Sequence, residues 1–335
     1  MNATALVCHD GPRVELCDVE LPEPGPGHIV IRTLASGISP GTELALMQQK
    51  ITWGPFPLCT GYQAVGVVED VGAQATGYVA GQRVYYRDNA AMHLPGGPAV
   101  SCVSGTHASR AVVDPQRTHG LAVLPDGVDV AAASLYALPA VGLNGVDMAN
   151  PRMGQTVVVH GVGLVGLGVV AACAHRGCRV IAIDLDSHRL DVARALGADE
   201  LVNGREVDAR QRLRELAPNM ADVVFECTGS PACLDPAIAM CRTHGTFVWQ
   251  GNYGEQPVSL KFLGAHNRRL TMYFPCDDGL APCRAAVLKN MARGVLPWHE
   301  TITHELEPSD AAPLLNRMLA GEGGDVLGAV VHWSA

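Results

Sequence analysis

A glycine-rich segment, Gly161-Val162-Gly163-Leu164-Val165-Gly166, constrains this chain of 335 residues more than any other feature. It follows the apolar run Thr156 to His160 and opens a stretch with helical character, which is the context that the spacing G-x-G-x-x-G needs to bind a dinucleotide. The first glycine then allows a tight turn, the second lets the backbone approach a pyrophosphate, and the third lets the helix pack closely on the strand. The predicted cofactor contacts here are Gly161, Gly163, Leu164, Val165 and Gly166.

The next apolar run, Arg179 to Ile183, ends at Asp184, which lies 18 residues beyond Gly166. A carboxylate at this position accepts hydrogen bonds from the adenosine ribose and repels a 2′-phosphate, so it predicts NAD rather than NADP. A helix N-cap or a surface aspartate is the alternative for Asp184. Arg189 is close enough to serve a 2′-phosphate, although a solvated helix position is the simpler interpretation.

From about residue 155 apolar strands alternate with helical stretches. This alternation predicts an α/β fold with a doubly wound parallel sheet, the Rossmann arrangement. Two later strands end next to Thr228 and Gly229, and next to Gly251 and Asn252. Ligands bind at the carboxyl ends of such strands, so these four residues are predicted to line the nicotinamide half of the site. Turn chemistry alone is the alternative explanation of the glycines. The predicted strands are 156–160, 180–184, 223–226 and 246–250, and the predicted helices are 164–175 and 188–196.

The first third of the chain has short β-prone runs separated by Gly and Pro, which predicts a compact β domain. The last 60 residues contain a helical stretch, a short strand near Thr301 and a closing strand, and we expect this tail to return partly to the first domain. The predicted domains are therefore 1–145, 146–275 and 276–335. The runs in question are 29–34, 64–71, 83–86 and 109–113, followed near the end by 281–293 and 329–333.

Composition narrows the class of partner and the compartment. The formal charge of −9 gives no basic surface for a phosphate backbone or an anionic membrane, so nucleic acid and membrane are not expected partners. The stretch 157–174 is interrupted by His160 and four glycines, and residues 1–14 lack a secretory pattern. Eleven cysteines occur without a CxxC pair, which predicts buried free thiols in a reducing compartment. We expect a cytoplasmic protein that acts on a small molecule.

The order of these features resembles the medium-chain dehydrogenase/reductase superfamily, in which a chaperonin-10-like β domain precedes a Rossmann domain. The resemblance implies an NAD-dependent oxidoreductase that assembles as a homodimer or homotetramer. A more distant likeness, to the bacteriochlorophyllide hydroxyethyl dehydrogenase branch, rests on residues 36–43, on Gly61-Tyr62 and loosely on Ile302-Thr303-His304. The segments that carry the superfamily resemblance are 35–39, 61–66, 81–84, the glycine fingerprint and Asp184.

Zinc-dependent members of this superfamily hold a catalytic zinc with a cysteine, a His-Glu pair and a further cysteine or acid. The matching positions here are Ser39 or Pro40, Tyr62 with Gln63, and approximately Tyr136. They lack the thiolate and imidazole donors that zinc selects. The lobe that holds a structural zinc is replaced by residues 89–104, which contain only Cys102. A site made of His93, His107 and Cys102 fits no usual zinc spacing, so we expect no metal.

The resemblance places Tyr62 and Thr42 toward the cleft in which zinc would lie. Tyr62 is the predicted hydrogen-bond donor or general acid and base, and Thr42 would pass a proton through the cofactor ribose. Ser39 and Gln63 would complete the polar lining. The alternative for Tyr62 is an aromatic ring that fills the vacated metal site, and Glu43 is expected to brace the loop.

The remaining candidates have structural interpretations of equal or greater weight. Tyr136, Asn144 and Trp53 could shape a substrate pocket or simply pack. His107 and His266 stand isolated in the sequence and are interpreted as satisfied side chains. The run 266–269 either contacts phosphates or a neighbouring subunit, or is a solvated charge cluster.

Three functions remain open from the sequence. The first is the interconversion of a secondary alcohol, such as a polyol or sugar derivative, and a ketone. The second is the reduction of an enone or quinone by a zinc-free branch of the superfamily; those branches generally use NADPH, and Asp184 argues against them. The third is a non-catalytic protein that senses NAD(H).

Overall fold

The computed structural model describes residues 1–118, 120–275 and 280–333, which form two compact units. Residues 1–136 and 288–335 make the first unit, and residues 137–287 make the second. These units differ from the predicted ranges at two helices. The predicted boundary at 145 falls inside α3 (Ala137–Ala149), which packs on α4 of the second unit. The predicted boundary at 275 lies before α9 (Ala281–Ala292), whereas the observed division between residues 287 and 288 falls within that helix.

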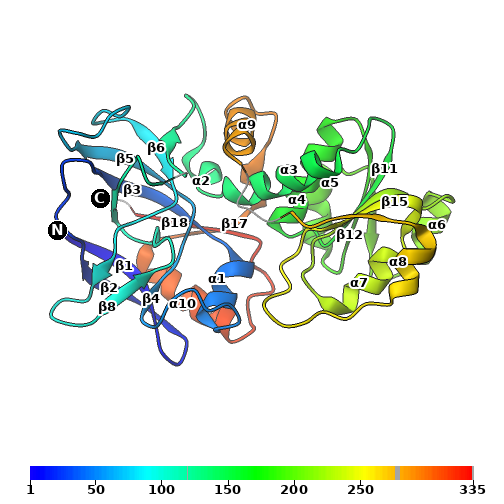
Figure 1. The fold of residues 1–335 in the computed structure, drawn as a ribbon, viewed down its shortest axis with the longest axis horizontal. Helices are drawn as coiled ribbons and strands as arrows, with labels where there is room; N and C mark the ends of the chain where they lie inside the picture. The colour runs from blue at the N-terminus through cyan, green and yellow to red at the C-terminus, as the bar shows by residue number, and fades with distance from the viewer. Residues whose placement is uncertain (119, 276–279, 334–335) are drawn as a thin grey trace. The chain divides into compact units, whose positions relative to one another are not determined.

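The second unit contains a six-stranded sheet in the order β13-β12-β11-β14-β15-β16, in which all neighbouring strands run parallel (Figure 1). This is the doubly wound order, with the first strand of the domain in the centre of the sheet, and it confirms the predicted Rossmann fold. The strands are β11 (Thr156–His160), β12 (Arg179–Asp184), β13 (Glu200–Asn203), β14 (Ala221–Glu226), β15 (Cys241–Trp249) and β16 (Thr271–Tyr273).

Helices cover this sheet because its strands bury side chains on both faces. Val158 and Phe247 pack with Leu213 and Leu234 from two helices, while Val157, which points to the opposite face, is also fully buried. The helices of this unit are α3, α4 (Leu164–His175), α5 (Ser187–Ala195), α6 (Ala209–Leu216), α7 (Pro231–Ile238), α8 (Phe262–Arg268) and most of α9.

The first unit is built from two β structures. One is a sheet in the order β10-β6-β5-β3-β18-β17, with β9 beside β3, and the other is a closed barrel in the order β1-β2-β7-β8-β4. Short helices complete the unit: α1 (Pro40–Met47), α2 (Val130–Ala133) and α10 (Pro308–Leu319). The strands are β1 (Asn2–His9), β2 (Arg13–Glu20), β3 (Ile29–Ile38), β4 (Leu58–Cys59), β5 (Ala64–Val71), β6 (Arg83–Tyr86), β7 (Met92–His93), β8 (Ala99–Cys102), β9 (Arg110–Val113), β10 (Ala122–Val123), β17 (Ile302–Leu306) and β18 (Gly328–His332).

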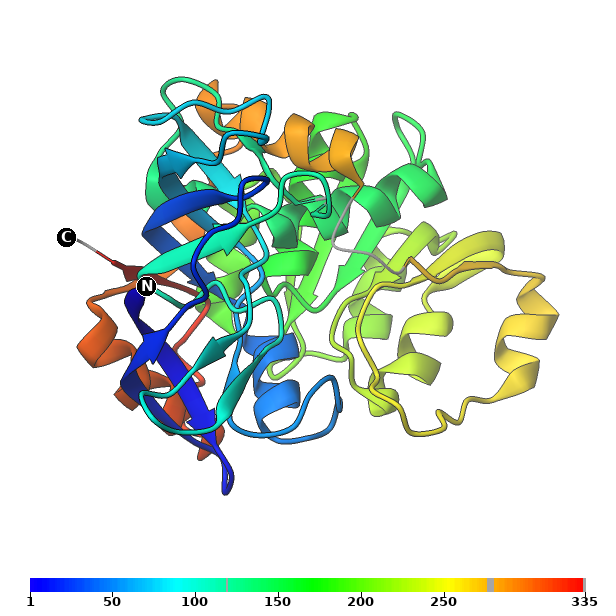
Figure 2. The same cartoon turned by 60° about the vertical axis from the view of Figure 1, so that its left-hand side comes forward.

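The C-terminal segment is part of this first unit. Strand β18 pairs antiparallel with the second half of β3, from Ala35 to Ile38, and the red β18 runs beside the blue β3 in Figures 1 and 2. This pairing explains why β3 continues to Ile38, whereas the sequence pattern predicted a strand that ends at residue 34. The predicted strand near Thr301 is β17, and it follows a short 3₁₀ turn, Trp298–Thr301.

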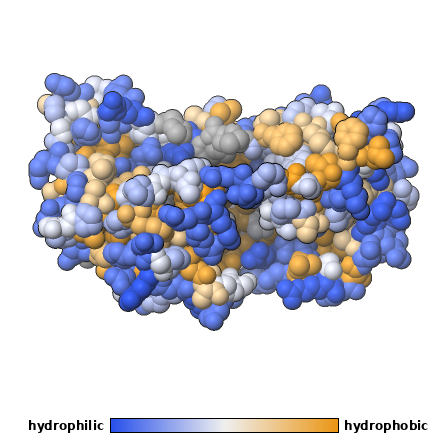
Figure 3. Space-filling model, turned by 60° about the horizontal axis from the view of Figure 1, so that its bottom comes forward, coloured by the Kyte–Doolittle hydropathy of each residue, from blue (hydrophilic) through white to orange (hydrophobic). Residues whose placement is uncertain are grey.

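The polarity of the surface and the state of the cysteines can be compared with what the composition predicted. On the face drawn in Figure 3, hydrophilic and hydrophobic residues are interspersed. The ten cysteines within the described residues are free thiols, buried or partly buried, as expected for small apolar side chains. None of the described helices combines the length and the apolar character that crossing a bilayer requires.

Candidate active site

The turn between β11 and α4 requires glycine at two of the three fingerprint positions. Gly161 has a φ of +92°, and a Cβ there would lie 2.7 Å from Cγ2 of Thr228. A Cβ on Gly166 would lie 2.0 Å from the carbonyl oxygen of Gly161. The tight turn and the close approach of helix to strand therefore explain both glycines without a ligand.

Gly163 is different, because the fold does not require it. It is the N-cap of α4, its φ of −69° suits any residue, and a Cβ there would meet no protein atom within 4 Å. The first amide groups of α4, at Leu164 and Val165, have no carbonyl partner within the helix. A bare backbone beside free amide donors at a helix N-terminus is the arrangement that accommodates a phosphate group.

Asp184 connects this turn to the neighbouring strand. Its Oδ2 accepts a hydrogen bond from the backbone N–H of Val162 over 2.7 Å, and its Oδ1 accepts one from Leu185 over 2.7 Å. The carboxylate keeps acceptor capacity for further donors, such as ribose hydroxyls. Asp184 is not a helix N-cap, since Asp186 caps α5 by accepting from the backbone N–H groups of His188 and Arg189.

The ends of β14 and β15 pack against each other. A Cβ on Gly251 would lie 2.5 Å from the backbone nitrogen of Gly229, and a Cβ on Gly229, whose φ is +67°, would lie 2.7 Å from the carbonyl oxygen of Asn252. The structural alternative thus accounts for both glycines. Thr228, Gly229, Gly251 and Asn252 nevertheless lie where predicted, at the carboxyl ends of the parallel strands.

Sequence reasoning missed a buried carboxylate at this edge of the sheet. Glu226, fully buried at the end of β14, accepts hydrogen bonds from the backbone N–H of Thr228 over 3.0 Å, and from the hydroxyls of Thr228 and Tyr253. A glutamate at the end of an apolar run was the available signal. Burial is the leading cause of the raised pKa of Tyr253, and the hydrogen bond to the Glu226 carboxylate adds to it.

His160 was also missed, although it directly precedes Gly161. Its Nδ1 is buried, lies 3.9 Å from the Glu226 carboxylate and has no hydrogen-bond partner among the described residues. Burial lowers the pKa of His160, and this outweighs the attraction of Glu226 and Asp184, which favours the charged ring. A neutral imidazole with an open hydrogen-bonding atom therefore lies beside the glycine turn.

In the first unit, the N-terminus of α1 brings three predicted residues together. Ser39, the N-cap residue, leaves the backbone uncapped and instead accepts a hydrogen bond from the Tyr62 hydroxyl over 2.7 Å. The side chain of Thr42 also hydrogen-bonds Tyr62, and the Arg87 guanidinium lies 6.0 Å from the centre of its ring. Burial raises the pKa of Tyr62, and the hydrogen bonds to Ser39 and Thr42 oppose that rise only in part.

Gln63 has a different environment. Its side chain is fully buried, and its amide nitrogen lies 3.5 Å from the carbonyl oxygen of Gly37. The backbone N–H of Gly37 in turn donates to the carbonyl of Gln63 over 3.1 Å. These contacts make Gln63 a brace for the end of β3.

Below α1 a buried polar network contains the glutamate that was expected to brace the loop. The Glu43 carboxylate accepts hydrogen bonds from the backbone N–H of Ser39 over 2.7 Å and from the Thr60 hydroxyl over 2.7 Å. His107 Nε2 lies 2.8 Å from the same carboxylate. Glu43 does brace the loop, and His107, although isolated in the sequence, is a buried side chain with hydrogen-bond partners, as interpreted.

The far end of this network joins His107 to the residue that follows β18. Trp333 can only donate, and its Nε1–H donates to Ser36 Oγ over 2.8 Å. The Ser36 hydroxyl in turn lies 2.8 Å from His107 Nδ1, so both ring nitrogens of His107 have a hydrogen-bond partner. All four side chains are buried.

The other candidates are placed as follows. Tyr136 is fully buried with its ring 4.5 Å from that of Tyr85, in the first unit, and Asn144 is buried in α3 of the second. Trp53 is 63% exposed. The His266 ring stacks on Phe262 at 5.0 Å. In the run 266–269, Arg268 donates to the carbonyls of Cys241 and Gly264, so part of the run has local partners.

The residues at the family's metal position do not suit zinc. Ser39 and Tyr62 offer hydroxyls that bond to each other, and the Gln63 amide is buried against Gly37. Within the described ranges, the groups of three possible ligands are His9, Glu15 and Cys17, and His160, Glu226 and Cys233. Neither group includes this position, and zinc selects thiolate and imidazole donors that it lacks.

Comparisons with known proteins agree with this architecture. Residues 25–126 match the alcohol dehydrogenase GroES-like domain, and residues 165–290 match the zinc-binding dehydrogenase family. An L-threonine 3-dehydrogenase of Streptomyces coelicolor is 32% identical, with 70% of this chain and 72% of that protein covered. A 5-exo-hydroxycamphor dehydrogenase of Pseudomonas putida is 29% identical over 95% and 96% of the two chains.

Solved structures share the fold over almost the whole length. A zinc-binding dehydrogenase of Sinorhizobium meliloti bound to NADP superimposes with a TM-score of 0.85 at 19% identity, covering 99% of each chain. A short chain alcohol dehydrogenase of Escherichia coli complexed with NADH gives 0.82 at 17% identity, also covering 99% of each chain. With the two family models and the relatives above, these likenesses show that the chain belongs to the medium-chain dehydrogenase/reductase superfamily of oxidoreductases.

Proposed function

We propose that this protein interconverts a secondary alcohol and a ketone with NAD(H), and that it does so without zinc. The observation that carries the proposal is the Tyr62 hydroxyl, held by Ser39 and Thr42 at the position where the family places its metal. The relatives named above include dehydrogenases of alcohols, and they support this class of substrate. A cytoplasmic homodimer or homotetramer is part of the same proposal.

The second unit would hold the cofactor. The amide groups of Leu164 and Val165 and the bare backbone of Gly163 would receive the pyrophosphate. The Asp184 carboxylate would accept hydrogen bonds from the adenosine ribose and repel a 2′-phosphate, which favours NAD. A bound nicotinamide supplies the hydride chemistry. Solved neighbours carry either NADP or NADH, so the preference for NAD rests on Asp184.

The first unit would handle the proton on the substrate oxygen. Burial raises the pKa of Tyr62, so the phenol stays protonated at neutral pH. Its single proton is directed at Ser39 Oγ in this structure, so a bound ketone would accept that proton's hydrogen bond while the Ser39 hydroxyl turns to donate to the phenol oxygen. Thr42 and Ser39 hydrogen-bond the same phenol, which allows them to orient it and to return a proton to it. Ketone reduction is the direction that this protonation state favours near neutral pH.

The test is an assay of NADH oxidation against a panel of ketones and enones, before and after exhaustive chelation of the protein. We expect turnover of ketones that survives chelation. Loss of turnover that added zinc restores, with no change in the melting temperature on chelation, would contradict the metal-free mechanism. Turnover of enones alone would replace the proposal by enone or quinone reduction, and NADH binding without turnover of any panel member would favour an NAD(H)-sensing protein.

A further inference from the structure

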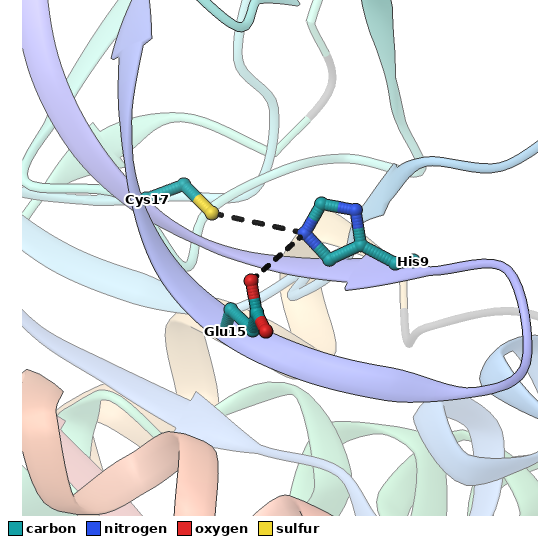
Figure 4. Close-up of side chains that lie close together, drawn as sticks. All are labelled: His9, Glu15 and Cys17. Atoms are coloured by element: carbon teal, nitrogen blue, oxygen red, sulfur yellow. Dashed lines mark hydrogen bonds and ion pairs between the residues drawn. The ribbon is translucent and has the colours of Figure 1, made fainter.

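Three side chains with metal-ligating atoms converge on the hairpin of β1 and β2 in the first unit. In the register of this hairpin Val7 faces Glu15 and Ala5 faces Cys17. His9 follows Val7 by two residues, so His9, Glu15 and Cys17 all lie on one face of the hairpin. Figure 4 shows the imidazole directed toward both the thiol and the carboxylate.

The separations of the donor atoms approach those of a tetrahedral zinc site. His9 Nε2 lies 3.8 Å from Cys17 Sγ and 3.6 Å from Glu15 Oε2, and all three donor atoms lie within 4.8 Å of one another. Zinc with its usual bond lengths holds sulfur, nitrogen and oxygen ligands about 3.4–3.6 Å apart. Two of the three separations therefore need to shorten by only about 0.3 Å or less.

Contacts within the protein leave these donors available. The 3.6 Å separation between His9 and Glu15 is longer than a hydrogen bond, and the contact to sulfur is at the long limit. Arg13 contacts Glu15 through Oε1, which leaves Oε2 directed at His9. The side chains of His9 and Glu15 are 33% and 44% exposed, so an ion can reach them.

The electrostatics favour a cation at this point. Burial, together with the nearby charges of Glu15 and Asp18, raises the pKa of the Cys17 thiol. A divalent ion reverses this balance because it stabilises the thiolate and offsets the carboxylates. Zinc is the ion that thiolate, imidazole and carboxylate accept together, with a water molecule as the fourth ligand.

We propose that His9, Glu15 and Cys17 bind one Zn²⁺ that links the two strands of the β1–β2 hairpin. This site contains none of Ser39, Thr42 and Tyr62, and it stands independently of the proposed function. The ion would link the two strands across their turn and stabilise the folded state by mass action.

The experiment uses the full chain, stripped of metal and titrated with zinc against a chromophoric chelator, and then with Co²⁺ alone. We expect one equivalent of zinc and a thiolate-to-cobalt charge-transfer absorption. Cys17→Ser should abolish that absorption. Cys17→Ser and His9→Gln should each weaken zinc binding at least about tenfold, since loss of even a residue that orients a ligand costs about 10–100-fold. His93→Gln and Cys102→Ser, which alter an exposed imidazole and a partly buried thiol of the same barrel, are the matched controls and should bind as the parent does.

A measurement on the unaltered protein covers the case of a variant that fails to fold. Bound zinc should slow alkylation of Cys17 by iodoacetamide at least about tenfold while leaving the alkylation of Cys102 unchanged. No bound equivalent, an absorption that survives Cys17→Ser, or equal alkylation with and without zinc would each overturn the site. Turnover of the Cys17→Ser protein is measured separately. If this variant loses the ion but keeps its turnover, the proposed catalysis is unaffected. If its turnover depends on zinc, only the metal-free mechanism is contradicted.

Discussion

The Tyr62 hydroxyl donates a hydrogen bond to Ser39 Oγ over 2.7 Å, between the segment that follows β4 and the N-terminus of α1. The Ser39 hydroxyl is available for this contact because it makes no capping hydrogen bond to the first turn of α1, while the Glu43 carboxylate accepts from the backbone N–H of Ser39 and holds the loop. The buried network below α1 thus holds the loop, and the serine can orient the tyrosine.

Replacing Tyr62 by Phe tests the proton donor. Removing the hydroxyl should lower kcat by about 10²–10⁴, the range typical of a positioned acid or base, while the affinity for NADH stays nearly unchanged. Tyr78→Phe is the matched control, because the Tyr78 hydroxyl, also in the first unit, donates to a backbone carbonyl, that of Leu121, over 3.2 Å. Rapid-reaction kinetics and fluorescence titration measure the two quantities, and an unchanged kcat would remove Tyr62 from the mechanism.

The raised pKa of Tyr62 predicts opposite pH dependences for the two directions. The protonated phenol predominates below a pKa that lies above the ordinary value of 10, so ketone reduction should stay flat through neutral pH and fall only at alkaline pH. Alcohol oxidation needs the phenolate and should rise about tenfold per pH unit below that pKa. Profiles of kcat/KM decide this, and a rise in oxidation that persists in Tyr62→Phe would assign the titration to another group.

Two glycine substitutions separate folding from cofactor binding. Gly163→Ala meets no protein atom, so thermal unfolding should be unchanged while NADH affinity falls at least about tenfold through obstruction of the phosphate approach. Gly166→Ala would place its Cβ 2.0 Å from the carbonyl of Gly161, so it should lower the melting temperature. Calorimetry and NADH titration on both proteins distinguish the effects, and normal NADH binding by Gly163→Ala would refute the proposed phosphate position.

Asp184→Asn tests the choice of cofactor. The amide keeps one oxygen that can accept from Val162, but it removes the charge that repels a 2′-phosphate. We expect the ratio of NADH to NADPH affinity to fall by about tenfold or more, corresponding to about 1.4 kcal/mol. Titration with both nucleotides gives the ratio, and a ratio equal to that of the parent would remove Asp184 from cofactor selection.

Glu43→Gln tests the buried network. The substitution places an amide donor among groups that all donate to position 43, namely the Ser39 amide, the Thr60 hydroxyl and His107. The free energy of unfolding should fall by about 1–3 kcal/mol, the cost of leaving a buried donor without its acceptor. Glu69→Gln, on the partly exposed surface of β5, should cost at most about 1 kcal/mol and serves as the control in urea unfolding.

The parts of the fold that depend on local pattern could be predicted from the sequence. Helix α4 and strand β11 have the predicted bounds, and the order of glycines around residue 161 predicted the nucleotide-binding turn. The tight turn at Gly161 and its contact with Gly166 involve residues close together in the sequence, so the spacing of these glycines predicts the local structure. The absence of thiolate and imidazole groups at positions 39, 62 and 63 could also be predicted from the sequence, because the donor atoms of a side chain depend only on the residue type.

The rest depended on contacts between distant parts of the chain. Sequence alone determined the two kinds of domain and the residues available at each loop, because periodicity and glycine spacing are local. Only the tertiary structure decided that His107 lies beside Glu43, 64 residues away, and that Trp333 reaches Ser36 across 297 residues. Trp333 reaches Ser36 because β18 pairs with β3, and His107 is placed by backbone hydrogen bonds to Leu6 and Thr60. The need to satisfy every buried donor then selects the side-chain hydrogen bonds.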